Sequence, residues 1–443
     1  MDTVDKLYDV SNGFSGYHQT HPSRKPDMSL RETSRGTPGG EYLRRFWHPV
    51  AYMRELTNVP LKIRALSEDL VVYKDGGGEV GCLFMNCCHR NTSLEFAVVE
   101  PNGLRCCYHG RLFAADGTIL EIPGETEEFR ANCKVRQGAY PTHVDHGVVF
   151  IYMGPPERKP VFPACDKFSV PGLKVTEGDR WPVTCNWLQI RENTMDPAHT
   201  ATLHALPQYR GGKQFSDEFG NFPDLMNWFE TPGGNLYMAV RRVGDNIWVR
   251  SNECIGPTYS GITSIFETGK SIKRVALPFM TMYLLPVDDT NSMRFYVNHI
   301  APDETMPFEE RRKLVNFAQF NDRPYSERQY LPGDCEALEG QGPLNDNKHE
   351  HLGGNDRGVA MFRRYIRQGI EDVRNGKDPH GVYFDVKDVP PTLTNDYVCK
   401  ATGIGGDPSD PEVLKRFTEW LLKDYLAYPP IPDLINSNEK ERS

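Results

Sequence analysis

Four residues in the first quarter of the chain have the types and the spacing of a metal site. Cys87 and His89 form a Cys-x-His pair, and sixteen residues later Cys106 and His109 form a Cys-x-x-His pair. Two thiolates and two imidazoles on two short loops suit a [2Fe–2S] cluster in which histidines replace two cysteines on one iron. A structural zinc site with the same four ligands is the alternative. Zinc motifs more often combine Cys-x-x-Cys with a histidine pair, which favours the cluster.

The segments around these pairs resemble a known domain. Gly110 directly follows the second pair, where a tight ligand loop needs positive φ. The runs CCHRNTSLEF (87–96) and LRCCYHGRLFAADG (104–117) resemble the Rieske domain of the non-haem iron ring-hydroxylating oxygenases. The chain departs from that pattern at Cys88, where a small residue or proline is usual, and at Arg111, where tryptophan is usual.

Composition and charge narrow the class of protein. A chain of 443 residues is long enough for about two domains with ample core. The net charge of -9 gives no basic excess for nucleic acid. We expect no signal peptide and no membrane span, since neither a cationic start followed by an apolar run nor a long apolar segment occurs. Eleven cysteines, some adjacent, favour reduced thiols and metal ligation over disulfides, which predicts a cytoplasmic protein.

The periodicity divides the chain into three parts. Residues 1–47 read as a polar arm and a short helix, 48–157 as a small all-β domain, and 158–443 as an α+β domain built on an antiparallel sheet. Both ligand pairs fall on loops of the all-β part. The predicted strands there are 60–65, 70–74, 80–85, 104–107 and 148–153.

The third part combines strands with helices. Predicted strands are 236–243, 247–252, 262–266, 281–286 and 293–300, and predicted helices are 308–320, 358–375 and one from Asp410-Pro411 to about 428. The helix at 358–375 rests on an apolar stripe of period 3.6 that ends at Gly376. The last helix is predicted because Asp410 is a suitable N-cap and Pro411 a suitable first helical residue.

A second group of possible metal ligands lies in the run Glu192-Asn193-Thr194-Met195-Asp196-Pro197-Ala198-His199, which continues to His204. Two neutral imidazoles with one carboxylate would make the facial triad of a non-haem Fe(II) oxygenase. On an ideal α-helix His199 and His204 are about 140° apart, so they do not share a face cleanly. We expect a helix to start at Asp196-Pro197, and a local distortion would then have to bring both rings to one metal. A pair of structural histidines near an N-cap aspartate is the alternative.

The same run matches the iron-binding pattern of the Rieske oxygenases without a gap. That resemblance implies that His199 and His204 are iron ligands and that Asp196 bridges to a histidine of the cluster. It also implies a carboxylate ligand late in the chain, which we assign to Asp334 in the segment Pro332-Gly333-Asp334-Cys335-Glu336. Glu336, Glu339 and Asp322 are the competing carboxylates.

The resemblance, which covers roughly residues 36–381, also implies an activity. The runs GTPGGEYLRRFWHPV (36–50) and DRGVAMFRRYIRQGI (356–370) are most similar to the branch with phthalate dioxygenases and aryl-ether O-demethylases. The expected protein is an oxygenase component with a helix-grip, START-like catalytic domain, a Rieske [2Fe–2S] cluster and a mononuclear non-haem Fe(II). It would use O2 to hydroxylate or O-demethylate an aromatic or polycyclic acid. No dinucleotide fingerprint is present, so a separate NAD(P)H-dependent reductase or ferredoxin would supply electrons. The family's transfer of electrons between neighbouring subunits implies a homotrimer.

The substrate pocket is predicted from residues around the second site. Tyr209, Arg210 and Trp248 are the residues selected, and Arg210 or Arg250 could face a substrate carboxylate. Two other functions remain open at this point. They are a Rieske-type electron-transfer protein without a catalytic iron and a zinc-stabilised binding protein.

Overall fold

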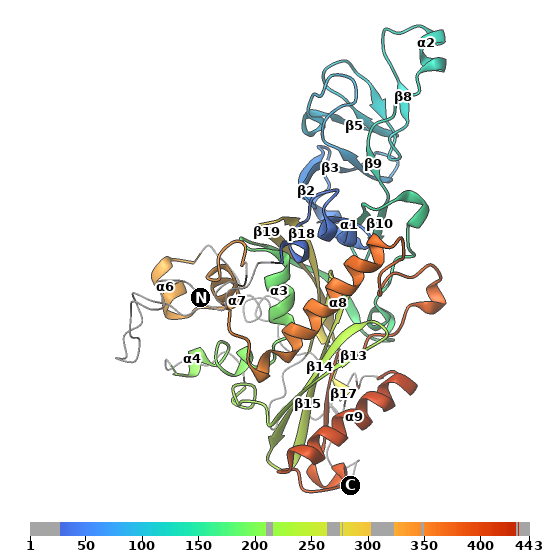
Figure 1. The fold of residues 1–443 in the computed structure, drawn as a ribbon. Helices are drawn as coiled ribbons and strands as arrows, with labels where there is room; N and C mark the ends of the chain where they lie inside the picture. The colour runs from blue at the N-terminus through green and yellow to red at the C-terminus, as the bar shows by residue number, and fades with distance from the viewer. Residues whose placement is uncertain are drawn as a thin grey trace.

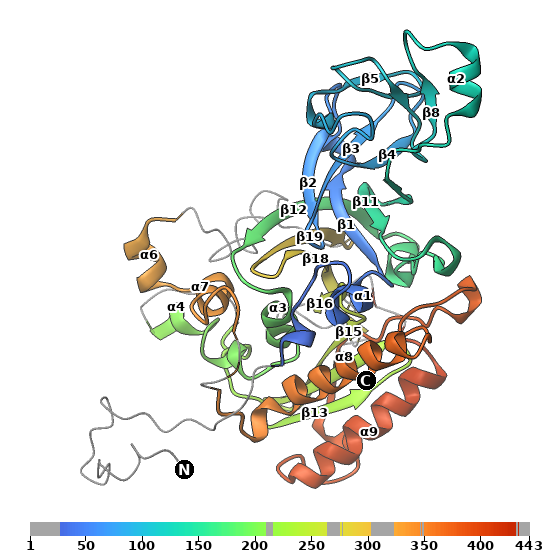
Figure 2. The same ribbon diagram turned by 45° about the horizontal axis from the view of Figure 1, so that its top comes forward.

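The computed structural model describes residues 27–209, 216–263, 275–276, 278–302, 323–345, 347, 350–430 and 433. Two parts are evident in the ribbon (Figure 1). A narrow β-rich part carries β5, β8 and α2, and a wider part carries a large sheet with helices against it. The same arrangement persists after rotation (Figure 2), so the two parts do not merely overlap in one view. The predicted α+β class, with a small β domain before a sheet-rich domain, is confirmed.

Three small antiparallel sheets make up the β-rich part. The first has the order β1-β11-β10, the second β2-β3-β4-β9 and the third β5-β6-β7-β8. Every strand predicted between residues 60 and 153 is present, with bounds that differ by one to two residues. The strands are β1 (Trp47–Tyr52), β2 (Leu61–Ala65), β3 (Glu68–Lys74), β4 (Val80–Phe84), β5 (Val98–Glu100), β6 (Gly103–Arg105), β7 (Leu112–Phe113), β8 (Ile119–Glu121), β9 (Ala139–Tyr140), β10 (Thr142–Asp145) and β11 (Val148–Tyr152), with helix α2 at Glu127–Asn132.

One large antiparallel sheet forms the centre of the second part. Its strand order is β12-β19-β18-β16-β15-β14-β13, and β20 pairs with both β15 and β17. The strands are β12 (Lys174–Val183), β13 (Leu225–Glu230), β14 (Gly234–Val243), β15 (Asn246–Ile255), β16 (Tyr259–Thr263), β17 (Val275–Ala276), β18 (Pro278–Asp288), β19 (Asn291–Ile300) and β20 (Asn395–Lys400). Strand β20 comes from the C-terminal tail, so the tail is part of the sheet and not an appendage.

Helices cover both faces of this sheet. Alternate residues of β14 and β15, among them Leu236 and Val249, pack with α9 (Pro411–Ala427) in one apolar cluster. The opposite face meets α3 (Trp187–Thr194) and α8 (Arg357–Arg374), whose stripe of Phe362, Ile366 and Ile370 is buried as its period of 3.6 predicts. The remaining helices are α1 (Pro38–Leu43), α4 (Leu206–Tyr209), α6 (Tyr325–Tyr330) and α7 (Asp334–Glu339).

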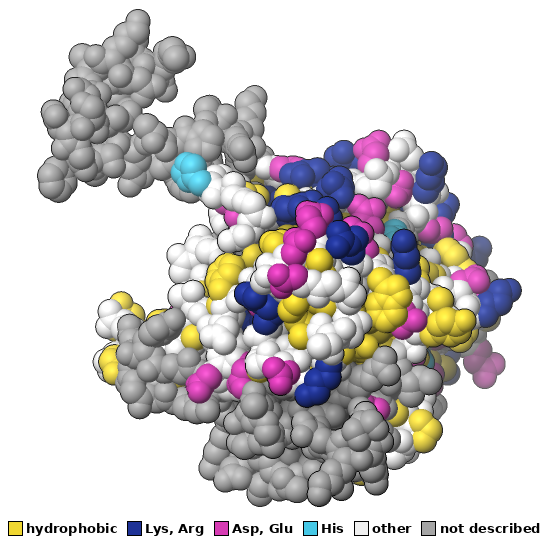
Figure 3. Space-filling view, turned by 90° about the horizontal axis from the view of Figure 1, so that it is seen from below, with side chains coloured by type: hydrophobic (Ala, Val, Ile, Leu, Met, Phe, Trp, Pro, Cys, Tyr) yellow, Lys and Arg dark blue, Asp and Glu magenta, His cyan; other side chains and the backbone are white. Residues whose placement is uncertain are grey.

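The start of the last helix is confirmed at the position that its capping residues predict. The Asp410 side chain accepts a hydrogen bond from the Glu412 amide at the N-cap of α9, with Pro411 as the first helical residue. The helix predicted over 308–320 lies outside the described residues. In the described part of the chain, no helix has the length and apolar character that spanning a membrane requires. On the face seen in Figure 3, acidic and basic side chains are interspersed among hydrophobic ones.

Candidate metal centres

The first centre is built on two loops that follow β4 and β6. In the first loop the Cys87 amide donates to the Thr92 carbonyl and the Asn91 amide to the Cys87 carbonyl, both at 2.9 Å. In the second, the Cys106 amide donates to the Arg111 carbonyl at 2.9 Å and Gly110 adopts φ +70°. A side chain at Gly110 would be strained by that φ, which explains the glycine predicted to close this loop.

The four predicted cluster ligands fall into two chemically distinct pairs. Cys87 and Cys106 are 2% and 3% exposed, and their thiols hydrogen-bond to each other. His89 and His109 are exposed, with ring centroids 4.7 Å apart. Sulfur ligands inside and nitrogen ligands outside suit the two unlike irons of a [2Fe–2S] cluster bound by two cysteines and two histidines. Burial and the neighbouring thiol raise the pKa of Cys87 to about 11, so a cation is needed to hold its thiolate form.

The second centre lies just beyond the end of α3, and the predicted helix from Asp196-Pro197 is wrong. Helix α3 ends at Thr194, and between it and His204 the chain forms only the 3₁₀ turn His199–Ala201. The Asp196 carboxylate accepts a hydrogen bond from the Ala198 amide at 2.8 Å, a local bond that favours a turn. The separation expected on an ideal α-helix therefore does not apply, and the rings of His199 and His204 lie 5.2 Å apart, centroid to centroid.

The backbone fixes which nitrogen of His199 can bind a metal. The Nδ1 atom lies 2.5 Å from the carbonyl oxygen of Asp196. A carbonyl only accepts hydrogen bonds, so Nδ1 must carry the proton and Nε2 has a lone pair to offer. This is how second-sphere partners commonly orient a metal-binding histidine.

Asp334 supplies the carboxylate that faces both rings. It is the first residue of α7, and its Oδ1 lies 3.7 Å from the Nε2 of His199 and 3.5 Å from the Nε2 of His204. The three ligand atoms lie within 4.8 Å of one another, close enough for one ion about 2 Å from each. Burial, together with the nearby charge of Arg250, lowers the pKa of His204 to about 4, although Asp334 opposes the shift. His204 is thus a neutral imidazole near pH 7, the form that binds a metal.

The competing carboxylates have other partners. Glu336 forms ion pairs with Arg328 at 2.7 Å and Arg323 at 3.1 Å, and its carboxylate also caps the start of α7 through the Gly333 amide. Glu339 accepts a hydrogen bond from the Thr184 amide at 2.9 Å. The remaining competitor, Asp322, lies outside the described residues.

The predicted substrate residues are only partly described. Arg210 lies outside the described residues, as does the side chain of Tyr209, which ends α4. Trp248 is fully buried, and its Nε1 donates to Asp396 at 2.8 Å. Sequence reasoning missed Asp396, Arg241 and Phe219, because nothing in their local sequence indicates that they approach the second centre.

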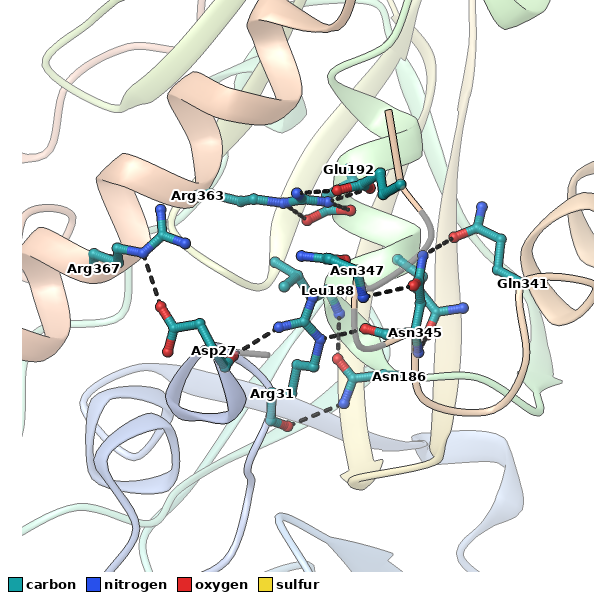
Figure 4. A network of polar contacts seen from close by, with 12 residues as sticks. Asp27, Arg31, Asn186, Leu188, Glu192, Gln341, Asn345, Asn347, Arg363 and Arg367 are labelled. Atoms are coloured by element: carbon teal, nitrogen blue, oxygen red, sulfur yellow. Dashed lines mark hydrogen bonds and ion pairs between the residues drawn. The ribbon is translucent and has the colours of Figure 1, made fainter. Parts of the chain in front are cut away.

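A buried polar network fixes helix α3 against the N-terminal segment and α8 (Figure 4). Arg363 of α8 bonds both oxygens of Glu192, at 2.5 and 2.7 Å, and its other contacts are with Glu350 at 2.6 and 2.8 Å. The Arg31 guanidinium donates to the Asn345 carbonyl at 2.6 Å. The Arg31 carbonyl accepts a hydrogen bond at 3.0 Å from the side-chain amide of Asn186, the N-cap of α3. The network thereby sets the position of the helix that leads directly into Asp196 and His199.

Replacing Arg363 with methionine should destabilise the protein by about 3–5 kcal/mol, because the buried Glu192 and the partly buried Glu350 would lose their common cation. The matched control is Arg364→Met on the same helix, where an exposed pair with Glu230 is worth less than about 1 kcal/mol. The midpoint and slope of denaturant unfolding, followed by circular dichroism, compare the two variants. Equal stability of the two variants would contradict the role given to the network.

Several known proteins are similar to this chain in sequence or in fold. Residues 46–141 match the model of the Rieske [2Fe-2S] domain. The chain is 38% identical over 363 residues to the tert-butanol monooxygenase / tert-amyl alcohol desaturase oxygenase subunit of Aquincola tertiaricarbonis, covering 78% of this chain and 76% of that one. It is 36% identical over 403 residues to the phenoxybenzoate dioxygenase subunit alpha of Ectopseudomonas oleovorans, covering 88% of this chain and 95% of the relative.

Solved structures share the fold at lower identity. Pseudomonas putida CBB5 NdmB matches with a TM-score of 0.60 at 18% identity, over 85% of this chain and all of that one. Dicamba monooxygenase bound to dicamba matches with a TM-score of 0.59 at 17% identity, over 76% of this chain and 99% of the other. At these identities the likeness establishes the arrangement of elements.

Proposed function

The chain belongs to the Rieske non-haem iron oxygenases, and we propose that it hydroxylates or O-demethylates an aromatic acid. It is the oxygenase component of a system that draws electrons from a separate reductase or ferredoxin, and its cofactors are a Rieske [2Fe–2S] cluster and a mononuclear non-haem iron. The convergence of His199, His204 and Asp334 is the observation that carries the proposal. A triad of this kind argues against the two alternative functions, which are an electron carrier without a catalytic iron and a zinc-stabilised binding protein.

We propose Cys87, His89, Cys106 and His109 as the cluster ligands and the triad as the iron ligands. Three protein ligands on one side would leave the opposite side of the iron open to O2 and substrate. The chemistry that the iron would supply is the activation of O2. The protein's own part is orientation. The Asp196 carbonyl keeps the Nδ1 proton on His199, and burial keeps His204 neutral. In this proposal residues 1–47 form an arm and short helix, 48–157 the Rieske domain and 158–443 the catalytic domain.

An aromatic acid is the substrate class that the relatives' names favour. Phenoxybenzoate, 5,5'-dehydrodivanillate and phthalate appear in the names of three relatives, at 36%, 31% and 28% identity. The tert-butanol relative acts on alcohols by its name, so a test of substrate class must include one.

We infer that the cluster of one subunit serves the iron of a neighbour in a homotrimer. The β5–β8 sheet and α2 stand at the end of the Rieske part that faces away from α3, α4 and α7, in both views (Figures 1 and 2). His89 and His109 are exposed there, so another subunit can approach them. Asp196, whose side chain is 26% exposed next to His199, is the proposed bridge between the centres. A cytoplasmic location stays a prediction.

The test uses the purified full chain with a reductase and NADH. Iron analysis should find one iron per chain beyond the two of the cluster, with inorganic sulfide present. Phenoxybenzoate, phthalate, methoxylated benzoates and tert-butanol are then offered, and products are identified by mass spectrometry. Oxygenated or demethylated acids are expected. A colourless preparation without sulfide would overturn the assignment of the cluster, and oxidation of the alcohol only would overturn the assignment to aromatic acids.

Asp196→Asn is expected to retain both metals and to slow substrate-dependent oxidation of the reduced cluster by at least about tenfold, as is common when a partner of a metal ligand is altered. Asparagine keeps an oxygen that can accept the Ala198 amide, so the turn should survive and only the charge is lost. Stopped-flow absorption of the reduced enzyme with O2 and substrate measures the rate. A native rate would show that Asp196 is not the bridge.

A further inference from the structure

A buried pair of arginines borders the second metal centre. Arg241 of β14 and Arg250 of β15 are 1% and 7% exposed. The Nη2 of Arg241 donates to the Thr200 hydroxyl at 3.2 Å, directly beside His199 in the chain. The guanidinium of Arg250 lies 4.7 Å from the ring centre of Phe219, and that ring lies 5.9 Å from the ring of His204. Arg241 thus bonds the residue that follows His199, and Phe219 packs against both Arg250 and His204.

The positive charge of this pair is only partly balanced. Asp396 of β20 is 2% exposed and acts electrostatically on both arginines while accepting the Trp248 indole N–H. Burial raises the pKa of Asp396 to about 7, and burial together with Arg250 lowers the pKa of Arg241 to about 10, so Arg241 stays charged at neutral pH. Among the described residues, the other carboxylate that acts on Arg241 is Asp224, which already forms an ion pair with Arg242 at 2.7 Å. A buried excess charge of this kind costs free energy unless an anion joins it.

Both arginines also have a buried donor to offer. Among the residues that the structure describes, the Nη1 atoms of Arg241 and Arg250 are buried without a hydrogen-bond acceptor, and the Oδ2 of Asp396 is buried without a donor. The Nε donors of both arginines are engaged: the Nε of Arg241 bonds the Asn221 carbonyl at 2.9 Å, and the Nε of Arg250 bonds the Thr263 hydroxyl. The guanidinium positions are therefore fixed, and a guanidinium offers its paired N–H groups to a planar carboxylate especially well.

We propose that Arg241, Arg250 and Asp396 form an anion box that holds the carboxylate of the substrate next to the triad. Asp396, contributed by the C-terminal strand β20, keeps the two like charges together and sets how strongly they attract the substrate. The proposal rests on the proposed oxygenase function and adds to it the residues that select acids.

The test measures binding to the holoenzyme by calorimetry, with 3-phenoxybenzoate and phthalate as the acids and 3-phenoxybenzamide as the neutral partner. Arg250→Met should weaken acid binding at least about tenfold and leave the amide unchanged, since the charge-assisted bond is lost. Asp396→Asn should tighten acid binding, because asparagine can still accept the Trp248 N–H but no longer offsets the arginines. Opposite changes in acid affinity in the two variants separate this role from structural damage, because damage would weaken acid binding by both. Arg242→Met, an exposed neighbour paired with Asp224 at 2.7 Å, is the control.

Equal loss of acid and amide binding in Arg250→Met, or weaker acid binding in Asp396→Asn, would overturn the anion box. Binding of the amide but of neither acid by the unaltered enzyme would do the same. The oxygenase assignment is judged separately, by iron content and by O2-dependent oxidation of the cluster. If Arg250→Met does not fold, the Asp396→Asn result alone decides.

Discussion

Replacing His199 with alanine is expected to abolish turnover and to leave the absorption spectrum of the cluster unchanged. The substitution removes one of three ligand atoms that lie within 4.8 Å of one another. Loss of a partner behind a metal ligand costs about 10–100-fold in metal affinity or activity, so loss of the ligand itself should cost at least about 100-fold. Iron analysis should show one iron fewer per chain, while the reduced-state EPR signal of the cluster persists.

The control is the same substitution at an exposed histidine. His351 lies outside the triad and is exposed, so His351→Ala should keep native turnover and native iron content. Product formed by the His199→Ala enzyme at a rate near that of the His351→Ala enzyme would refute the assignment of His199 to the iron.

The cluster loops could be predicted from sequence because their information is local. Each loop spans a few residues and joins neighbouring strands, so the spacing of Cys87, His89, Cys106 and His109 already limits their geometry. The strands and helices that carry apolar stripes were predicted for the same reason. Burial of one face leaves a period of 3.6 in the sequence of a helix, and α8 shows it. Strand β14 is buried along almost its whole length, so a run rich in apolar residues marks it instead of a period of 2.

The second centre was predictable only in part. The pattern from Asp196 to His204 indicated a metal site, but the 3₁₀ turn that unites the rings depends on the Asp196 carboxylate bonding a nearby amide. Asp334 was assigned through resemblance, since a long stretch of chain separates it from the histidines and no local period marks it. Its ligand role, like those of the histidines, remains a prediction.

The anion box could be predicted from sequence only in part, because the sequence indicated Arg250 as a residue that could face a substrate carboxylate but indicated neither Arg241 nor Asp396. Arg241 and Arg250 sit on neighbouring strands, and Asp396 arrives from the C-terminal tail through the pairing of β20 with β15, in which Arg250 lies opposite Asp396. That register depends on the complete sheet. Single arginines in a strand are usually surface residues, so neither residue type nor periodicity separates these from the others.

Co-assembly of two inactive variants is expected to restore activity. This result distinguishes electron transfer between subunits from electron transfer within one chain. Cys106→Ser removes a proposed cluster ligand and His199→Ala a proposed iron ligand, so each variant alone should be inactive. In a ring, the intact cluster of a His199→Ala subunit can face the intact triad of a Cys106→Ser neighbour.

The expected recovery can be calculated for a trimer that contains both variants. A working junction needs one variant on each side in the right order, which holds at one of the three junctions of every mixed trimer, so activity per chain should reach roughly a third of the native value. Two differently tagged variants, co-expressed and purified through both tags, provide the mixed assembly, and size exclusion confirms its state. If both centres served each other within one chain, the mixed assembly would stay as inactive as its parents, whatever its size. Asp196→Asn can then be added to the Cys106→Ser subunit, which carries the intact triad. Loss of the recovered activity would place the bridging carboxylate on the iron side of the junction, beside His199, whose Nδ1 is already bound by the Asp196 carbonyl.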